Sequence, residues 1–350
     1  MKNKFLLLFA DCRIVQGYKN SIIYDLTRLN NSNFIPTSLI EFIRMCEKHS
    51  INEVLNQYDE GDRKTALSYI DFILEREYGF LADSHVKKNL GKLDLSYNDP
   101  SVVHNSIVCL NKSTVSSFSA IQQQLDELLC VNLELRLVDL SISDLNNVFK
   151  CIADSVLESV LVRLNFSSIY TEDTIKKILI KHKRIKHIYV YHSPRNSIGE
   201  NYTYLTKKVD FIRDCGIINK TRFVINQQFF IESQSCNTCL NKKISVDFNG
   251  EIKNCPSQNK SFGNVDSISL LKVIQKADFL SLGKIKKDQI AICKDCEYRH
   301  MCLDCRVFID NPTDSFSHPS KCKYNPYLGK WSSEEGYVTV QQFLKEKLIN

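Results

Sequence analysis

The run Cys293-Lys-Asp-Cys296-Glu-Tyr-Arg-His-Met-Cys302-Leu-Asp-Cys305 places four cysteines in one short stretch of the 350-residue chain. Two residues between paired cysteines let both thiolates of a pair point at one metal centre. Four more cysteines flank this run, at Cys236, Cys239, Cys255 and Cys322. In a reducing cytosol such a group is more often a metal site than a set of disulfides. The eight thiols therefore predict metal binding, and they divide naturally into two sites of four ligands.

The segment between Cys239 and Cys255 contains a turn signal. Asn249-Gly250 separates two short stretches, residues 244–248 and 251–255. This dipeptide favours a type I′ turn, so we expect a hairpin that returns Cys255 toward Cys236 and Cys239.

The identity of the metal stays open at this point. Two Cys-x-x-Cys pairs that are 15–20 residues apart indicate one zinc ribbon, but only five residues separate Cys296 from Cys302. In iron–sulfur proteins with two clusters, a compact run often sends one cysteine to the other cluster. Spacing alone is compatible with zinc and with iron–sulfur clusters.

The composition is that of a globular protein, with 43% hydrophobic and 25% charged residues. The net charge of +6 is mild and its basic residues are spread out, which argues against nucleic acid as a partner. No apolar run reaches about 18 residues, so we expect no membrane-spanning helix. The apolar run 5–10 is too short for an export signal, and Asp11 stands before Cys12. We therefore expect a cytoplasmic protein.

Six cysteines stand alone in the sequence, and free cysteine commonly packs as a small core hydrophobe. We expect this core-filling role for Cys12, Cys46, Cys109, Cys130, Cys151 and Cys215.

Residues 1–84 have a winged-helix pattern. Strands are expected at residues 5–10, 12–18 and 21–27, followed by three helices. The first helix follows Pro36, the second has a capping signal in Ser50 and Glu53, and the third covers residues 64–77. The helices carry acidic residues among their basic ones, so DNA recognition is not favoured.

Residues 85–230 alternate strand and helix, which predicts a parallel sheet with helices packed on it. About five βα units are present, too few for a closed eight-stranded barrel, so we expect a partial, open barrel. The overall fold class is α/β, or α+β for the whole chain. The expected strands are residues 106–110, 133–137, 160–164, 187–191 and 222–225, and the expected helices are residues 114–130, 144–155, 172–182 and 202–215.

The cysteine order CxxC…GxxxxC…CxxCxxxxxCxxC…C resembles the SPASM domain, the auxiliary-cluster module of many radical-SAM enzymes that modify peptides. Together with Cys322-Lys-Tyr-Asn-Pro-Tyr327 it resembles the grasp-with-spasm maturases, which work with an ATP-grasp peptide ligase. The resemblance implies a peptide-recognition module (1–84), a degenerate partial barrel (85–230), a SPASM domain (231–335) and a C-terminal helix or tail (336–350).

The resemblance also implies a cofactor and its ligands. Two [4Fe–4S] clusters are expected, with zinc as the alternative. The first cluster would be held by Cys236, Cys239, Cys255 and Cys305, and the second by Cys293, Cys296, Cys302 and Cys322.

One part of the family pattern is missing. Radical-SAM catalysis needs CxxxCxxC after the first barrel strand, where three thiolates leave one iron open to S-adenosylmethionine. At that place the sequence has Cys109 alone, and the motif occurs nowhere in the chain. We therefore expect no SAM cofactor and no SAM cleavage.

The resulting expectation is a maturation protein for a ribosomally made peptide. It would hold a leader peptide as an added strand on the edge of the third strand, 21–27. Its clusters would serve electron transfer or structure beside the ATP-grasp ligase. The alternatives are a redox enzyme that modifies the peptide directly and a zinc-stabilised regulatory protein.

Overall fold

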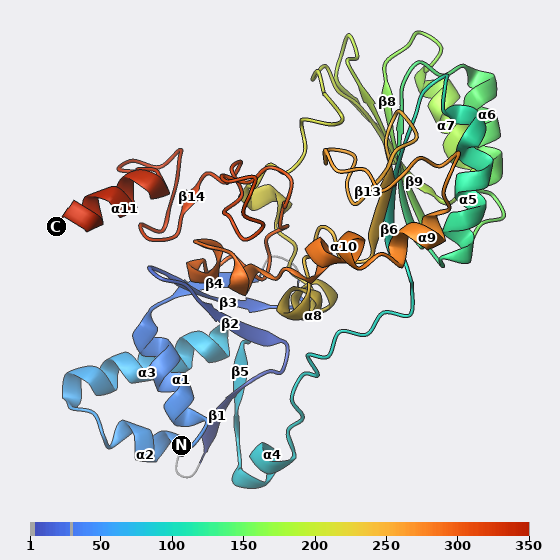
Figure 1. The fold of residues 1–350 in the computed structure, drawn as a ribbon. Helices are drawn as coiled ribbons and strands as arrows, with labels where there is room; N and C mark the ends of the chain where they lie inside the picture. Colours follow the sequence, from blue (N-terminus) through green and yellow to red (C-terminus); the bar gives the residue numbers. More distant parts are fainter. Residues whose placement is uncertain (1–3, 29–30, 350) are drawn as a thin grey trace.

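The computed structural model describes residues 4–28 and 31–349 of the chain (Figure 1). Near the N-terminus, β2 (Cys12–Gln16), β3 (Ser21–Asp25) and β4 (Ser32–Ile35) form an antiparallel sheet. The helices α1 (Thr37–Cys46), α2 (Ile51–Leu55) and α3 (Glu60–Glu75) follow. The order of one sheet and three helices agrees with the pattern expected from the sequence.

The start of α2 shows why this helix begins where it does. The Ser50 hydroxyl accepts a hydrogen bond from the Glu53 backbone, and the Glu53 carboxylate accepts one from the Ser50 backbone at 2.8 Å. This reciprocal pair satisfies two backbone donors that the first helical turn leaves without partners. The capping signal is therefore confirmed.

The expected edge position of the third strand is wrong. The strand order β2-β3-β4 places β3 in the centre, and Ile23 is completely buried. The sequence reading missed β4, which has no clear apolar alternation, and β5 (Gly79–Ala82), which pairs with β1 (Phe5–Leu8). The free edges of this sheet are therefore β2 and β4.

A sheet of eight strands, most of them parallel, forms the middle of the molecule, and its order is β10-β11-β9-β8-β7-β6-β12-β13. It has two ends, so it is open, and the expected α/β class with a partial barrel is confirmed. Figure 1 shows α5, α6 and α7 together on one face of this sheet. The strands are β6 (Asn105–Leu110), β7 (Asn132–Leu137), β8 (Ser159–Asn165), β9 (Ile185–Tyr191), β10 (Ser197–Ile198), β11 (Tyr202–Tyr204), β12 (Lys243–Val246) and β13 (Ile252–Lys253). The helices are α5 (Phe118–Glu127), α6 (Ile142–Cys151) and α7 (Glu172–Lys181).

Two expected elements of this region are wrong. Residues 222–225 form no strand, because a short 3-10 helix ends at Arg222 and irregular chain follows. Residues 202–215 form no α-helix. Instead β11 occupies 202–204, where Tyr202 and Tyr204 alternate into the core and pair in parallel with β9.

The cysteine-rich region, residues 236–322, contributes two strands to the same sheet. Strand β12 pairs in parallel with β6, and β13 folds back onto β12. The other α-helices and strands in the described ranges are α4 (Ser84–Asn89), α8 (Gln227–Ser235), α9 (Leu270–Ile274), α10 (Ala277–Leu280), β14 (Tyr324–Asn325), β15 (Lys330–Trp331) and α11 (Val340–Ile349). None of the helices in the described ranges is long and apolar enough to cross a membrane.

Candidate metal centre

The turn that joins β12 to β13 delivers Cys255 to the centre of the molecule. The hairpin forms as expected, with Val246 opposite Ile252. The turn type differs from the expected type I′, because Gly250 has a φ of +78° and Asn249 has no positive φ. The Gly250 N–H donates to the Asp247 carbonyl, as in a type I turn followed by a left-handed glycine.

The second set of expected ligands lines one pocket. Cys293, Cys296, Cys302 and Cys322 all line the same pocket. Its other walls include Ile218 and the rings of Tyr298, Tyr324 and Trp331. The structure thus brings together thiols that lie up to 29 residues apart in the sequence.

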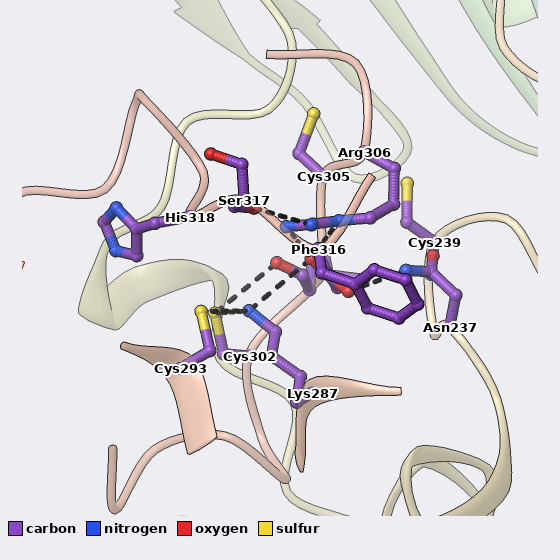
Figure 2. A network of polar contacts seen from close by, with 12 residues as sticks. Asn237, Cys239, Lys287, Cys293, Cys302, Cys305, Arg306, Phe316, Ser317 and His318 are labelled. Atoms are coloured by element: carbon purple, nitrogen blue, oxygen red, sulfur yellow. Dashed lines mark hydrogen bonds and ion pairs between the residues drawn. The ribbon is translucent and has the colours of Figure 1, made fainter. Parts of the chain in front are cut away.

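A buried lysine faces this second set. The Lys287 ammonium, which is 4% exposed, lies 3.4 Å from the Cys302 sulfur and 3.9 Å from the Cys293 sulfur (Figure 2). The carboxylate of Asp304 lies 3.8 Å from the same ammonium. Burial acts to lower the pKa of Lys287, but the nearby Cys293 and Cys302 thiols and Asp304 raise it well above its usual range. This positive charge favours thiolates in the pocket.

Burial opposes ionisation of the second set. It raises the pKa of Cys293 to about 12 and that of Cys322 to about 11, and it also raises the pKa of Cys296 and Cys302. Cysteine binds a metal as the thiolate, and a bound cation is what makes such ionisation favourable in a buried site. Four thiols around one pocket, two of them on buried and two on half-buried residues, therefore fit the donor set of a metal centre.

Three cysteines of the first set interact with one another. Cys239 is half-buried and interacts with Cys255 and Cys305, and its sulfur lies 3.9 Å from the Lys243 ammonium. Burial raises the pKa of Cys239 to about 11. The fourth expected ligand, Cys236, does not join them. Burial raises the pKa of Cys236. Among the described residues, Glu232 raises this pKa further and Lys242 lowers it.

A fourth thiol takes part in the first set. Cys215, which the sequence reading assigned to core packing, lies against Cys255. Interaction with Cys215 lowers the pKa of Cys255, and the same interaction raises the pKa of Cys215. The cysteine is isolated in the sequence, so no spacing signal could have identified it.

The sulfurs do not yet converge on common centres. Across residues 4–28 and 31–349, no three His, Cys, Asp or Glu side chains stand close enough together to hold a metal ion. Binding at either set therefore requires the thiols to turn toward a shared centre.

A buried ion pair separates the two sets. Arg306 contacts the Asp304 carboxylate at 2.8 Å, and both residues are almost completely buried. Asn237 donates to the other Asp304 oxygen at 2.7 Å. Figure 2 shows Cys293 and Cys302 beside Lys287, with Cys239 and Cys305 on the other side of the network around Arg306. Asn237, which lies between two cysteines of the first set in the sequence, and Lys287, which faces the second set, thus both contact the Asp304 carboxylate.

The face of the central sheet that points away from α5, α6 and α7 carries charge. The Glu134 carboxylate pairs with Arg136 at 2.7 Å and with Arg163 at 3.0 Å. Arg136 also interacts with Cys255 and with Cys109. The first set of thiols therefore lies next to this charged face rather than in the apolar core under the helices.

Cys109 lies on β6 and is completely buried. Burial raises its pKa to about 12. Its charged neighbours are Arg136, Glu134 and Asp247, and Cys255 is the thiol that interacts with it.

Comparison with known proteins finds a set of solved structures and one protein family. Three structures of SuiB from Streptococcus suis are similar to 86% of this chain, at 10–11% identity and a TM-score of 0.32. Two of them show SuiB bound to S-adenosylmethionine and to its precursor peptide SuiA, and both cover 96% of SuiB. No curated protein matches the chain. Residues 236–297 match the SPASM family, which is described as an iron–sulfur cluster-binding domain.

Proposed function

We propose that the chain holds two [4Fe–4S] clusters and acts in the maturation of a ribosomally made peptide. The observation that carries this proposal is the pocket lined by Cys293, Cys296, Cys302 and Cys322. The match of residues 236–297 to an iron–sulfur family supports iron over zinc. Bound clusters of this kind supply electron transfer.

The ligands of the two clusters follow the two sets of thiols. Cys293, Cys296, Cys302 and Cys322 hold the second cluster. Cys239, Cys255 and Cys305 hold the first, and the resemblance to the SPASM domain implies Cys236 as its fourth ligand. Lys287 stabilises the charge of the second set, and the Asp304–Arg306 pair holds the chain between Cys302 and Cys305 in place.

Metal analysis of anaerobically purified protein tests the proposal. Two clusters give about eight irons and a matching amount of acid-labile sulfide per chain. A colourless protein with two zinc ions would contradict it and would favour a zinc-stabilised protein. The matched control is Cys151→Ala, which removes a thiol outside both sets and leaves the iron content unchanged.

The peptide would bind at the outer edge of β4. The Asp25 N–H bonds to the Asn31 carbonyl, and pairing groups alternate along an antiparallel ladder. Ser32 and Phe34 therefore direct their backbone groups away from β3. Strand addition at such an edge gives affinity through backbone pairing. SuiB is bound to a precursor peptide, which supports a peptide as the partner here.

The position of this edge connects the peptide to the second set of thiols. The Phe34 side chain is 55% exposed, and its ring lies 6.0 Å from the ring of Tyr298. Tyr298 lines the pocket of the second set. A peptide strand on β4 would therefore lie beside that pocket.

A pair of proline variants tests the edge. Phe34→Pro removes an outward N–H of β4, so it weakens binding of the precursor peptide. Phe34→Ala removes the ring but keeps the backbone N–H, so it shows how much of the loss in affinity comes from the ring alone. Ile14→Pro removes an outward N–H from the opposite edge, on β2, and leaves peptide affinity unchanged. Equal losses in the two proline variants would contradict binding at β4.

We also propose that the chain does not cleave S-adenosylmethionine and that it works with an ATP-grasp peptide ligase. The first point is supported by the sequence around Cys109, which has no CxxxCxxC motif. The second is supported by the resemblance to grasp-with-spasm maturases. Co-purification of the two proteins with the precursor peptide tests the partnership, and independent elution of the ligase would contradict it.

A further inference from the structure

Cys215 lies in a loop that is held against the segment carrying Cys255. Its sulfur is 3.0 Å from the Ser257 hydroxyl, and that hydroxyl donates to the Ile212 carbonyl at 2.6 Å. Ser257 is two residues after Cys255. The two loops are therefore joined beside the Cys255 thiol, with which the Cys215 thiol interacts directly.

The residue after Cys215 packs against another thiol of the first set. Gly216 has a φ of +73°, and a Cβ atom at this position would lie 2.7 Å from the Cys305 sulfur. Only glycine permits this approach together with this backbone conformation. The Lys321 ammonium donates to the Cys215 carbonyl at 2.9 Å, which holds the loop in place. The Cys215 thiol thus interacts with both Cys255 and Cys305.

Cys236 lies in a different environment. It follows the last residue of α8, and its N–H donates to the Glu232 carbonyl at 2.8 Å. Its charged neighbours are Glu232 and Lys242. The Lys242 ammonium in turn donates to the Ser101 carbonyl at 2.8 Å, and Tyr97 also interacts with Cys236. The Cys236 thiol therefore lies near the segment 97–101 rather than among the thiols of the first set.

We infer that Cys215, and not Cys236, is the fourth ligand of the first cluster, together with Cys239, Cys255 and Cys305. This inference rests on the proposal that the region holds two clusters. The contact of Gly216 with Cys305 and the contact of Cys215 with Ser257 place the Cys215 loop against the segments that carry two of the other ligands. Four cysteine thiolates complete the ligand set of a [4Fe–4S] cluster.

Two alanine variants of the full chain test the assignment. Cys215→Ala and Cys236→Ala each remove one thiol, and both proteins are purified and reconstituted without oxygen. The measurements are iron and sulfide content and the electron paramagnetic resonance spectrum after reduction with dithionite. The second cluster, with four ligands elsewhere, reports in each variant that the region is folded.

The expected result distinguishes the two cysteines. Cys215→Ala leaves the first cluster with three protein ligands, so one of the two reduced signals is lost or changes its g values. Iron content falls from about eight toward about four per chain if that cluster is lost. Cys236→Ala keeps both signals and the full iron content.

Three outcomes would overturn the inference while the two-cluster proposal remains. The first is a changed signal of the first cluster in Cys236→Ala, whether or not Cys215→Ala also changes that signal. The second is a pair of unchanged signals in both variants. The third is the loss of both signals in Cys215→Ala. Native protein that binds no iron would instead refute the proposed function, and the assignment of Cys215 would fail with it.

Discussion

Replacing Arg306 by methionine should destabilise the cysteine-rich region strongly. The guanidinium donates to the Asp304 carboxylate through Nε at 3.0 Å, and its Nη2 lies 2.8 Å from the same oxygen. Its Nη1 donates to the carbonyls of Ser315 and Ser317 at 3.1 and 2.7 Å. Methionine fills similar space but offers no donor, so a buried carboxylate and two carbonyls lose their partner.

Removing one partner of a buried ion pair typically costs about 3–5 kcal/mol. Asp304 keeps Asn237 at 2.7 Å and the Lys287 ammonium at 3.8 Å, which places the expected cost near the lower end, at about 3 kcal/mol. Arg306→Lys retains the charge without the fork geometry and should cost less.

The chain has one tryptophan, Trp331, and it lines the pocket of the second set. Urea unfolding of metal-free protein, followed by Trp331 fluorescence, therefore reports on this region. The control is Asp278→Asn, because the Lys260–Asp278 pair is more than half exposed and ion pairs of this kind contribute little to stability. If Arg306→Met lowered the free energy of unfolding no more than Asp278→Asn does, the role assigned to the buried pair would be refuted.

Three further outcomes are expected. Cys293→Ala should remove one cluster signal and leave the other, and simultaneous loss of both would contradict two separate sites. Incubation with dithionite and S-adenosylmethionine should give no 5′-deoxyadenosine above buffer controls, because Cys109 has no partner thiols at the required spacing. Burial raises the pKa of Asp25, but hydrogen bonds from Thr27 and Arg28 outweigh it and lower the pKa to about 2. The carboxylate should therefore stabilise the N-terminal module by about 2.5 kcal/mol above its unfolded pKa near 4, and this contribution should fade as the pH falls toward 2. Asp25→Asn should remove it, so native and variant unfolding free energies that differ equally at pH 7 and pH 2 would contradict this account.

The sequence predicted the parts of the fold that have a regular local pattern. The βα alternation from β6 to β9 and the capping box at Ser50 follow from periodicity and local hydrogen bonding. The segment 202–215 was misread because an apolar pattern in a short stretch does not distinguish a buried strand from a helix. The pairing of β12 with β6 joins residues more than 130 positions apart, and no local pattern encodes it.

The candidate site also has one part that the sequence predicts and one part that it does not. The cysteines of the second set have characteristic spacing in the sequence, and the structure gathers all four around one pocket. Cys215 has no such signal, since its contact with Ser257 spans 42 residues. The resemblance to the SPASM domain implies Cys236 as a ligand, because two residues separate it from Cys239. The position of its side chain, however, depends on where α8 ends.

The parallel pairing of β12 with β6 limits how this chain can be divided. Asn105–Leu110 is an inner strand because Lys243–Val246 covers one side of it, and five of its six residues are buried. A fragment that stopped before β12 would turn β6 into an exposed apolar edge, which invites pairing with other chains and aggregation. The cysteine-rich region is therefore not structurally independent of the middle sheet. Transferring it to another protein would remove β12, the strand that pairs with the outer side of β6.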